Sequence, residues 1–340
     1  MNDRSSRVRA IVGRALGAFD GYAIENIECQ PPAPGHLAIE VHAAGVTFVD
    51  ALIASGRHQV KVPLPFIPGN EVSGVVVDVG EGVSGFFVGD RVACVGVGGK
   101  YAERIDVRQE AALKIPDRLS FADAAVFRGG FGCAYHALVQ GASITPGEHV
   151  LVLGAAGSVG IAAVQLAAAM GAKVIASAST DAKRKLALGL GASHAIDTNA
   201  VDWRDQVRSL TDGHGVDVVV DPVGGDATER AFRSLAVGGR HLVIGFAAGR
   251  IPSLPVNLAL LKGASLIGVE LSKFESRFPE LSASNDRAII ALYNRGAVQA
   301  PPIAHRFAFD DFREALTLAA TGQSLGSIVL EVKCDGGDAR

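Results

Sequence analysis

The chain has 340 residues, of which 49% are hydrophobic and only 6% aromatic, and its formal net charge is −3. This length suits two domains, and hydrophobicity carried by Ala, Val, Leu and Ile is typical of parallel strands covered on both faces. The slightly acidic balance, without a basic tract interleaved with aromatics, argues against a nucleic-acid partner.

Targeting segments and cysteines bear on the location of the protein. Residues 1–10 hold three arginines but no apolar core, and the most apolar later stretch, 254–269, is interrupted by Asn257, Lys262 and Gly263. We therefore expect neither a signal peptide nor a membrane span, and we expect a cytoplasmic protein. The cysteines have no paired spacing, so they predict neither a disulfide framework nor a zinc cluster. They are Cys29, Cys94, Cys133 and Cys334.

Up to about residue 126, the sequence consists of short runs that alternate apolar and polar residues and are broken by Gly and Pro. Such runs predict a compact, antiparallel, barrel-like β domain. The expected strands are 37–43, 71–79, 90–95 and 101–107.

From about residue 127, strands and helices alternate along the chain. This order predicts an α/β fold with a doubly wound parallel sheet of the Rossmann type. The expected strands are 150–153, 174–177, 195–197, 216–221, 241–246 and 265–269.

After residue 269 the alternation stops. A helix is expected around 286–295, and the strand candidates 304–309 and 327–332 rejoin the first domain in the simplest arrangement. The expected division therefore assigns 1–126 and 270–340 to the β-rich domain and 127–269 to the Rossmann domain.

A glycine turn follows the first Rossmann strand and reads Gly-Ala-Ala-Gly-Ser-Val-Gly over 154–160. Gly157 lets the backbone approach a diphosphate, Gly160 lets the following helix pack closely, and the first amides of that helix point at one anion. Ala155 stands where the first glycine of the usual motif would be. The order of strand, turn, helix and strand within one βαβ length favours a dinucleotide site over an ordinary glycine turn. The expected contacts are Ala155, Gly157, Ser158, Val159 and Gly160.

The end of the second Rossmann strand indicates which dinucleotide binds. A chain that uses NAD usually places Asp or Glu there, about twenty residues past the glycines, to bind the ribose 2′-hydroxyl. This chain has Ser177 and Ser179, followed by Lys183 and Arg184. Hydroxyls with a nearby cation accept a 2′-phosphate, which a carboxylate would repel, so we expect NADPH. The alternative is that Lys183 and Arg184 only form the solvated face of a helix.

Three further stretches, Gly45–Asp50, Pro63–Gly74 with Val88–Val92, and Asp221–Gly225, carry a family resemblance. With the glycine turn, they resemble the zinc-independent quinone oxidoreductase branch of the medium-chain dehydrogenase/reductase superfamily. The resemblance runs over nearly the whole chain. It implies a GroES-like N-terminal domain, a Rossmann domain, NADPH in the cleft between them, and a homodimer joined through the last Rossmann strands.

The resemblance also allows the zinc question to be asked residue by residue. Where the alcohol-dehydrogenase branch has a catalytic Cys and His, this chain has Thr47 and Asn70, which supply neither a thiolate nor an imidazole. Between residues 92 and 110 there is no C-x-x-C run for a structural zinc. We therefore expect no metal, and we interpret Glu71 as a structural carboxylate.

Without a Lewis acid, the acceptor must take up hydride readily by itself, as quinones and α,β-unsaturated carbonyls do. The resemblance places two residues at the acceptor: Thr47, where the family has Asn, and His58, where it often has Tyr. A histidine of ordinary pKa could protonate an enolate or hydroquinone oxygen at neutral pH. The alternative is a solvated loop histidine. Gly130 replaces a family hydroxyl and would widen the pocket.

The remaining cofactor contacts are implied by the resemblance alone. Thr198 stands where NADPH-dependent members often have a Tyr on the 2′-phosphate. Val223 lies in a glycine-containing turn beside the cofactor, and Gly245 and Phe246, at the end of the fifth strand, lie against the nicotinamide ribose. Val269 follows the strand whose backbone usually meets the carboxamide.

The sequence thus predicts an NADPH-dependent, zinc-independent oxidoreductase that transfers hydride to a small-molecule quinone or conjugated enone. A 2-enoyl-thioester reductase is an alternative within the same chemistry. A non-catalytic NADPH-binding structural or sensor protein is an alternative of another class. NADPH oxidation assays with quinones, enones and enoyl thioesters distinguish the three.

Overall fold

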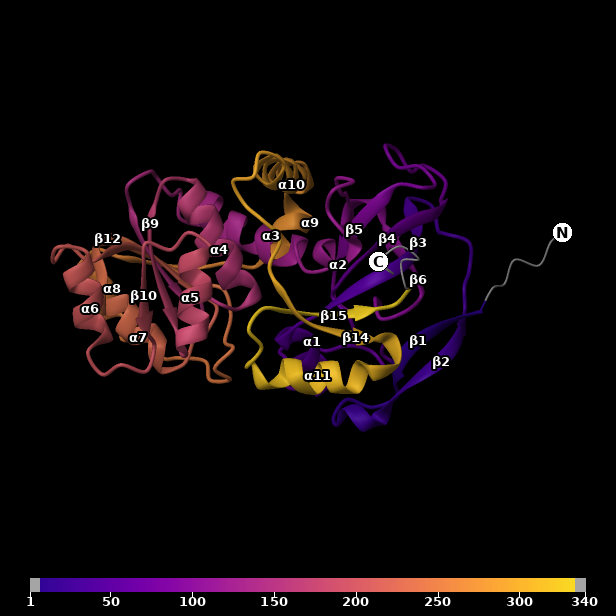
Figure 1. Ribbon diagram of the computed structural model, residues 1–340, viewed down its shortest axis with the longest axis horizontal. Helices are drawn as coiled ribbons and strands as arrows, with labels where there is room; N and C mark the ends of the chain where they lie inside the picture. The colour runs from indigo at the N-terminus through magenta and orange to yellow at the C-terminus, as the bar shows by residue number, and fades with distance from the viewer. Residues whose placement is uncertain (1–6, 334–340) are drawn as a thin grey trace. The chain divides into compact units, whose positions relative to one another are not determined.

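The computed structural model describes residues 7–333. Their contacts divide them into a first unit, which comprises the residues up to Gly129 and those from Ala300 onward, and a second unit, Gly130–Gln299 (Figure 1). Among these residues, no helix is both long enough and apolar enough to span a membrane.

The first unit is built on a seven-stranded sheet in the order β14-β15-β3-β4-β5-β7, with β6 paired to β3. Most neighbours are antiparallel, as the alternating runs predict, and β14 and β15 are parallel to each other. A separate hairpin joins β1 and β2. The strands are β1 (Arg7–Gly13), β2 (Tyr22–Glu28), β3 (His36–Val46), β4 (Glu71–Val79), β5 (Arg91–Val95), β6 (Arg104–Arg108), β7 (Ala112–Lys114), β14 (Ile303–Ala308) and β15 (Ser327–Glu331).

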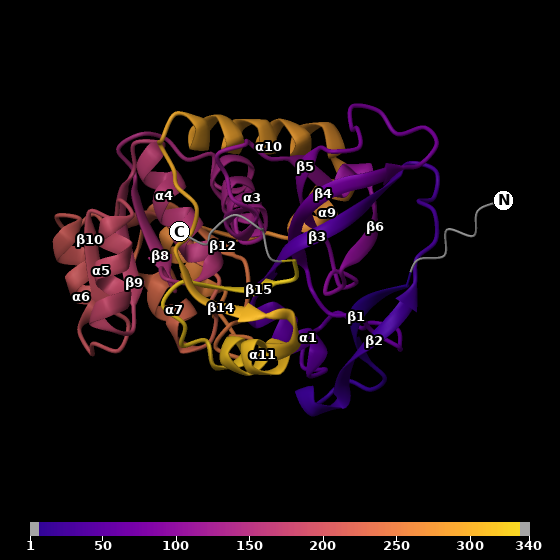
Figure 2. The same ribbon diagram turned by 45° about the vertical axis from the view of Figure 1, so that its right-hand side comes forward.

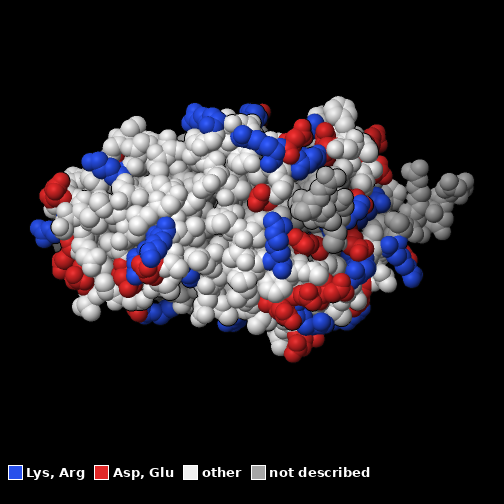
Figure 3. Space-filling view, viewed as in Figure 1, with Lys and Arg blue, Asp and Glu red and all other residues white. Residues whose placement is uncertain are grey.

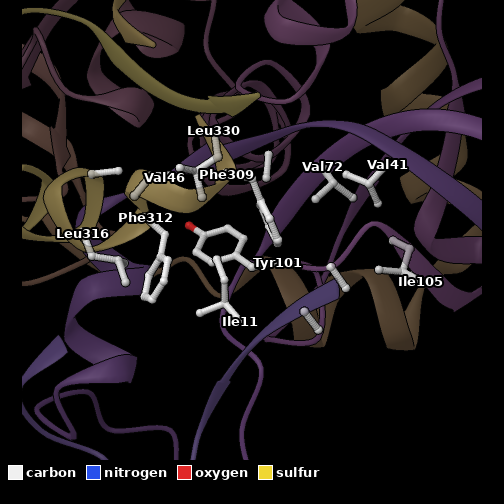
Figure 4. Close-up of a cluster of buried hydrophobic side chains, with 14 of the residues drawn as sticks. Ile11, Val41, Val46, Val72, Tyr101, Ile105, Phe309, Phe312, Leu316 and Leu330 are labelled. Atoms are coloured by element: carbon white, nitrogen blue, oxygen red, sulfur yellow. The ribbon is translucent and has the colours of Figure 1, made fainter. Parts of the chain in front are cut away.

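Short helices complete the first unit, and α11 lies beside α1 in both ribbon views (Figures 1 and 2). They enclose one apolar cluster that includes side chains from β1, β3, β4 and α11 (Figure 4). Tyr101 is fully buried in this cluster, and its hydroxyl donates to the Gly45 carbonyl oxygen at 3.0 Å. The α-helices are α1 (Phe48–Ala54), α2 (Phe121–Ala124) and α11 (Phe312–Thr321), and the 3₁₀ turns are Phe19–Gly21, Gln109–Ala111 and Phe309–Asp311.

The second unit contains a six-stranded parallel sheet in the order β10-β9-β8-β11-β12-β13, with helices on both faces (Figure 1). This order is that of a doubly wound dinucleotide-binding sheet, so the predicted Rossmann fold is confirmed. The strands are β8 (His149–Leu153), β9 (Lys173–Ala178), β10 (His194–Asp197), β11 (Val216–Asp221), β12 (Leu235–Val243) and β13 (Ser265–Gly268). The helices are α3 (Arg128–His136) with a π-turn at Ala137–Gly141, α4 (Ser158–Ala169), α5 (Asp181–Gly189), α6 (Trp203–Leu210), α7 (Asp226–Arg233), α8 (Asn257–Lys262), α9 (Leu271–Arg277) and α10 (Pro279–Asn294).

Residues 270–299 differ from the expected division, because their contacts place them in the second unit. In α9, the Phe274 ring stacks on His136 of α3 with ring centroids 3.9 Å apart. The long helix α10 (Figure 2) bonds back through Asn285, whose side chain exchanges hydrogen bonds with that of Gln140. The later strands β14 and β15 do rejoin the first unit, where β15 pairs with β3.

Several strand bounds also differ from the expectation, and those of β12 and β6 bear on named residues. β12 begins at Leu235 and ends at Val243, so Gly245 and Phe246 follow the strand instead of ending it. β6 begins at Arg104, because Tyr101 bonds through its amide to the Pro68 carbonyl oxygen and lies outside the ladder. Within 7–333 the cysteines are free thiols, and Cys334 lies outside the described residues.

Candidate functional site

The predicted dinucleotide contacts lie at one edge of the parallel sheet, because each lies at or just past the carboxyl end of a strand. That edge is where doubly wound sheets bind their ligands. The contacts are Ala155 to Gly160 after β8, Ser177 and Ser179 at the end of β9 with Lys183 beyond, Thr198 after β10, Val223 after β11, Gly245 and Phe246 after β12, and Val269 after β13.

The turn between β8 and α4 is held close to its helix. Gly154 has φ +58°, a conformation that favours glycine, and a Cβ on Gly160 would lie 2.2 Å from the Gly154 carbonyl oxygen. Gly157 is the N-cap of α4. The first turn of α4 leaves the amides of Ser158, Val159 and Gly160 without acceptors inside the helix. With the helix dipole, these amides form a site for a diphosphate.

The end of β9 offers hydroxyls instead of a carboxylate. The Ser177 hydroxyl is buried and shares a hydrogen bond of 2.8 Å with the Thr198 hydroxyl. Ser179 is exposed, and Lys183 is half-buried in the first turn of α5, where its amide donates to the capping Thr180 hydroxyl at 3.3 Å. This group of donors suits the 2′-phosphate of NADPH.

Arg184 is engaged elsewhere. Its guanidinium pairs with Asp197 at 3.3 Å and donates to the Ala178 carbonyl oxygen at 3.1 Å. Through these contacts, the Arg184 side chain links the end of β9 to the end of β10.

Asp221, which sequence reasoning named only as part of a motif, organises the turn after β11. Its Oδ1 accepts from the amides of Val223 and Gly224 at 2.9 and 2.8 Å. Its Oδ2 accepts from the Thr228 hydroxyl at 2.7 Å and pairs with His241 Nε2 at 3.0 Å. Burial alone would raise the pKa of Asp221, but the bonds from His241 and Gly224 hold that pKa below its ordinary value.

This edge of the sheet fits a dinucleotide. Its backbone approaches are too close for a Cβ at Gly154 and Gly160, where the nearest atoms would lie at 2.8 and 2.2 Å. Gly130 also packs against α4, since a Cβ there would lie 2.7 Å from Ser158 Oγ. Small residues thus allow the first turn of α4 to pack closely against the turn that precedes it and against α3.

In the first unit, Thr47 and Asp50 form a reciprocal cap on α1. The Thr47 amide and hydroxyl both donate to Asp50 Oδ2, at 2.8 and 2.5 Å, and the Asp50 amide donates to Thr47 Oγ1 at 3.3 Å. Asp50 therefore orders its own turn, as a capping box does. Thr47 is half-buried and Asp50 is only 1% exposed.

Around Asp50 lies a cluster of buried ionisable side chains, defined by Asp50, Glu71, Lys100 and Tyr101. Burial raises the pKa of Asp50 to about 6 and that of Glu71 to about 8, against opposing hydrogen bonds from Thr47 and Gly129. Glu71 Oε1 accepts from the Gly129 amide at 2.8 Å, which is consistent with the structural role inferred from the sequence. The Lys100 ammonium donates to the Gly98 carbonyl oxygen at 2.9 Å, and burial lowers its pKa.

His58 lies in the loop after α1. Its Nδ1 accepts from the Val60 amide at 3.1 Å, so the ring hydrogen belongs on Nε2. Burial lowers the pKa of His58. The lowered pKa disfavours the charged proton donor expected from the sequence, and the neutral ring offers an Nε2–H donor.

Thr47 and Asn70, which stand where the alcohol-dehydrogenase branch has zinc ligands, both make other hydrogen bonds. Thr47 caps α1, and the Asn70 side-chain oxygen accepts from the Gly98 amide at 3.0 Å. Across residues 7–333, no group of three His, Cys, Asp or Glu side chains is arranged to hold a metal ion.

A β-rich unit joined in one chain to a doubly wound unit with a dinucleotide turn defines the class: a two-domain oxidoreductase that uses a nicotinamide cofactor. Residues 33–117 match the alcohol dehydrogenase GroES-like domain family, and residues 158–285 match the zinc-binding dehydrogenase family. The chain belongs to the medium-chain dehydrogenase/reductase superfamily.

Within the superfamily, the chain is similar to quinone oxidoreductase-like proteins. It is 36% identical over 324 residues to quinone oxidoreductase-like protein 2 homolog of Nematostella vectensis, covering 95% of this chain and 87% of the relative. It resembles a mycobacterial structure complexed with NADPH, with TM-score 0.88, 30% identity and coverage of 95% and 100%. It also resembles the CurK enoyl reductase, with TM-score 0.87, 26% identity and coverage of 96% and 100%.

Proposed function

We propose that this protein is an NADPH-dependent, zinc-independent oxidoreductase that reduces a small-molecule quinone or conjugated enone. The observation that carries the proposal is the end of β9, where Ser177 and Thr198 share a hydrogen bond in place of the carboxylate that selects NAD. Zinc independence is supported by Thr47 and Asn70, which supply no zinc ligand of the usual kind.

In this proposal, the amides of Ser158, Val159 and Gly160 bind the cofactor's diphosphate, and Ser177, Ser179, Lys183 and Thr198 surround its 2′-phosphate. Val223, Gly245, Phe246 and Val269 line the nicotinamide half. When bound, NADPH supplies the hydride.

The acceptor is bound by Thr47 and His58. As hydride arrives, negative charge develops on the acceptor's carbonyl oxygen, and donors aimed at that oxygen stabilise it. The neutral His58 ring supplies one donor through Nε2–H. Binding also excludes water and fixes the reacting atoms in place.

We further propose a homodimer, formed through the free edge of β13, and a cytoplasmic location. The dimer is supported by the exposed side chain of Leu266 on β13 and by that of Leu260 on α8, the helix that precedes β13 in the chain. The location is supported by the free thiols Cys29, Cys94 and Cys133.

A 2-enoyl-thioester reductase is the second candidate. It is favoured by the structural likeness to an enoyl reductase at 26% identity. The chemistry is the same, because hydride adds to a β-carbon and charge collects on the thioester oxygen.

The test is a screen of NADPH oxidation over 1,4-quinones, alkenals and enoyl-CoA thioesters, with NADH as a matched donor and with and without EDTA. Turnover of quinones or enones with NADPH, unaffected by EDTA, is the expected result. Preferential turnover of enoyl-CoA selects the second candidate. Activity that EDTA removes and Zn²⁺ restores contradicts zinc independence, and NADPH binding without oxidation of any acceptor indicates a non-catalytic binding protein.

A further inference from the structure

The hydroxyl of Thr47 is already committed to another residue. It donates its hydrogen to Asp50 Oδ2 at 2.5 Å, while its oxygen accepts from the Asp50 amide at 3.3 Å. While Asp50 is a carboxylate, the hydroxyl hydrogen must point inward. Thr47 then offers an acceptor molecule only a lone pair, which would repel a developing oxyanion.

Protonation of Asp50 reverses this arrangement. A neutral Asp50 with its proton on Oδ2 donates to Thr47 Oγ1, and the Thr47 hydrogen is then free to point outward. The Thr47 amide, at 2.8 Å from Oδ2, remains bonded in both states because that oxygen keeps a lone pair. The same two side chains therefore have one state with an outward donor and one state without it.

We propose that Asp50 is the proton source for the reduced acceptor and that it delivers its proton through the hydroxyl of Thr47. The proposal rests on the proposed function, because it assigns the protonation step of that reaction. Thr47 is the residue that touches the acceptor, and Asp50 acts through it.

The step is balanced. Hydride addition leaves a negative charge on the acceptor oxygen. The Thr47 O–H bond breaks as its proton bonds to that oxygen, and the Asp50 Oδ2–H bond breaks as its proton bonds to Thr47 Oγ1. The products are a neutral hydroxyl on the acceptor, an intact Thr47 and an Asp50 carboxylate. Water returns the proton to Asp50 by the same route, since Thr47 is half-buried and Asp50 is almost fully buried.

The surroundings of Asp50 allow it to hold a proton near neutral pH. Burial is the main cause of its raised pKa of about 6. The opposing influences are the Thr47 hydroxyl and amide, the Asn70 amide and the Lys100 ammonium.

Two further groups face Asp50 from other elements. Glu71 on β4 has a pKa of about 8 and is therefore mostly neutral at pH 7. The Tyr101 hydroxyl, whose pKa is raised by burial and by Asp50, remains protonated and donates to the Gly45 carbonyl oxygen. Lys100 is thus the cation that faces Asp50, and no second carboxylate in the cluster competes with Asp50 for ionisation at neutral pH.

The test is the pH dependence of kcat from pH 5 to 8 with an acceptor found by the screen. In the wild type, kcat should be level below pH 6 and fall about tenfold per pH unit above it, because only protonated Asp50 can deliver. Asp50→Asn should retain an oxygen that accepts from Thr47 but should have no proton to give. Its kcat should be independent of pH and about 100-fold lower at pH 6.

Matched variants separate this role from a structural one. Thr47→Ser keeps the hydroxyl and should retain the wild-type pH profile, whereas Thr47→Val should lose it. Combining Thr47→Val with Asp50→Asn should lower kcat no further than either change alone, because the two act in one pathway. His58→Phe should be slower, yet it should keep the pH dependence. An Asp50→Asn enzyme with the wild-type profile overturns the proposal.

A second readout does not need turnover. In protein labelled with ¹³C at the Asp carboxyl carbons, the Asp50 signal is assigned by its loss in Asp50→Asn and is titrated by NMR. Thr47→Val should move the Asp50 midpoint to higher pH, because the hydroxyl bond to the carboxylate is lost. An unchanged midpoint overturns the coupling. If none of the acceptors in the screen supports NADPH oxidation by the wild type, the proposed function fails. This titration still decides whether Thr47 and Asp50 share a proton.

Discussion

At the scale of single residues, the first unit contains carboxyl groups whose burial has a stability cost. Glu71 is 5% exposed and keeps a proton near neutral pH, since its pKa is raised to about 8 from an ordinary value of 4.5. Between pH 4.5 and pH 8, therefore, Glu71 keeps its proton in the folded protein but has lost it in the unfolded chain. Folding stability from this group is fully present below that window and is lost as pH rises through it.

Glu71→Gln tests this linkage. Gln keeps an oxygen that can accept from the Gly129 amide, but it does not titrate. We expect the variant to gain stability relative to wild type as pH rises from 5 to 8, by up to about 1.4 kcal/mol per pH unit and a few kcal/mol in total. Urea unfolding at pH 5, 6.5 and 8 measures the difference. Because Asp50 titrates in both proteins, its contribution to the difference largely cancels. A difference in unfolding free energy between the variant and wild type that stays constant from pH 5 to pH 8 would contradict the raised pKa of Glu71.

The buried cluster also shows where single-residue prediction from sequence ends. The reciprocal cap of Thr47 and Asp50 is local, and a spacing of three residues is enough to indicate it. Lys100 and Glu71 reach Asp50 only through tertiary folding, and nothing in their own sequence surroundings marks them as buried and charged. The Thr47 hydroxyl, by contrast, is engaged within the local cap itself.

At the scale of elements, the carboxyl edge of the sheet depends on how its turns are held. The turn after β11 carries Val223 and packs against neighbouring turns, since a Cβ on Gly224 would lie 2.8 Å from the Phe246 ring and one on Gly154 2.8 Å from Val223. The Asp221 carboxylate accepts hydrogen bonds from the two amides of that turn and from Thr228, and it also pairs with His241. One carboxylate thus fixes the position of the turn that carries Val223, a proposed cofactor contact.

Asp221→Asn should weaken both the fold and the site. The amide side chain retains one accepting oxygen, so its NH₂ group faces donors that need an acceptor, and at least one buried pair is lost. We expect a loss of about 2–4 kcal/mol in the free energy of unfolding and weaker binding of NADPH. Urea unfolding and titration of NADPH fluorescence measure the two effects. Thr228→Val is the matched control that removes one bond from the same carboxylate, with an expected cost of about 1 kcal/mol. An Asp221→Asn protein as stable as wild type would show that the turn after β11 keeps its conformation without the Asp221 carboxylate.

Elements are predictable where the signal lies in neighbouring residues. The alternation of apolar runs indicates the strands of the Rossmann unit, and the glycine spacing indicates the start of α4. The assignment of residues 270–299 to the second unit is not predictable in this way. It depends on Phe274 meeting His136 and on Asn285 meeting Gln140, contacts that join positions more than a hundred residues apart.

At the scale of the whole molecule, charge and apolar surface point to different kinds of partner. On the face drawn in Figure 3, Lys and Arg side chains are interspersed with Asp and Glu, a mixed surface that favours solubility over binding to a polyanion. One run of exposed apolar side chains lies before and along β13. Leu260 and Leu261 of α8 are 82% and 75% exposed, and Leu266 on β13 is 51% exposed.

This distribution supports the proposed dimer, because β13 is the end strand of the parallel sheet and its outer edge is free to pair. A second copy of the same edge gives a closed, two-fold arrangement in which identical patches meet. Pairing would cover the exposed leucines and the unpaired backbone groups together.

Introducing charge at this edge tests the arrangement. The wild type should sediment at twice the 35.1 kDa of one chain, and Leu260→Glu combined with Leu266→Glu should sediment as a monomer, since two pairs of carboxylates would be buried at the interface. Leu188→Glu is the matched control, because Leu188 is 44% exposed on α5, far from β13 in the sheet order. This control should remain a dimer. A monomeric wild type, or an edge variant that still dimerises, would assign the exposed leucines to another partner. The edge variant should still bind NADPH, because the proposed cofactor residues lie at the carboxyl ends of the strands and not along the outer edge of β13.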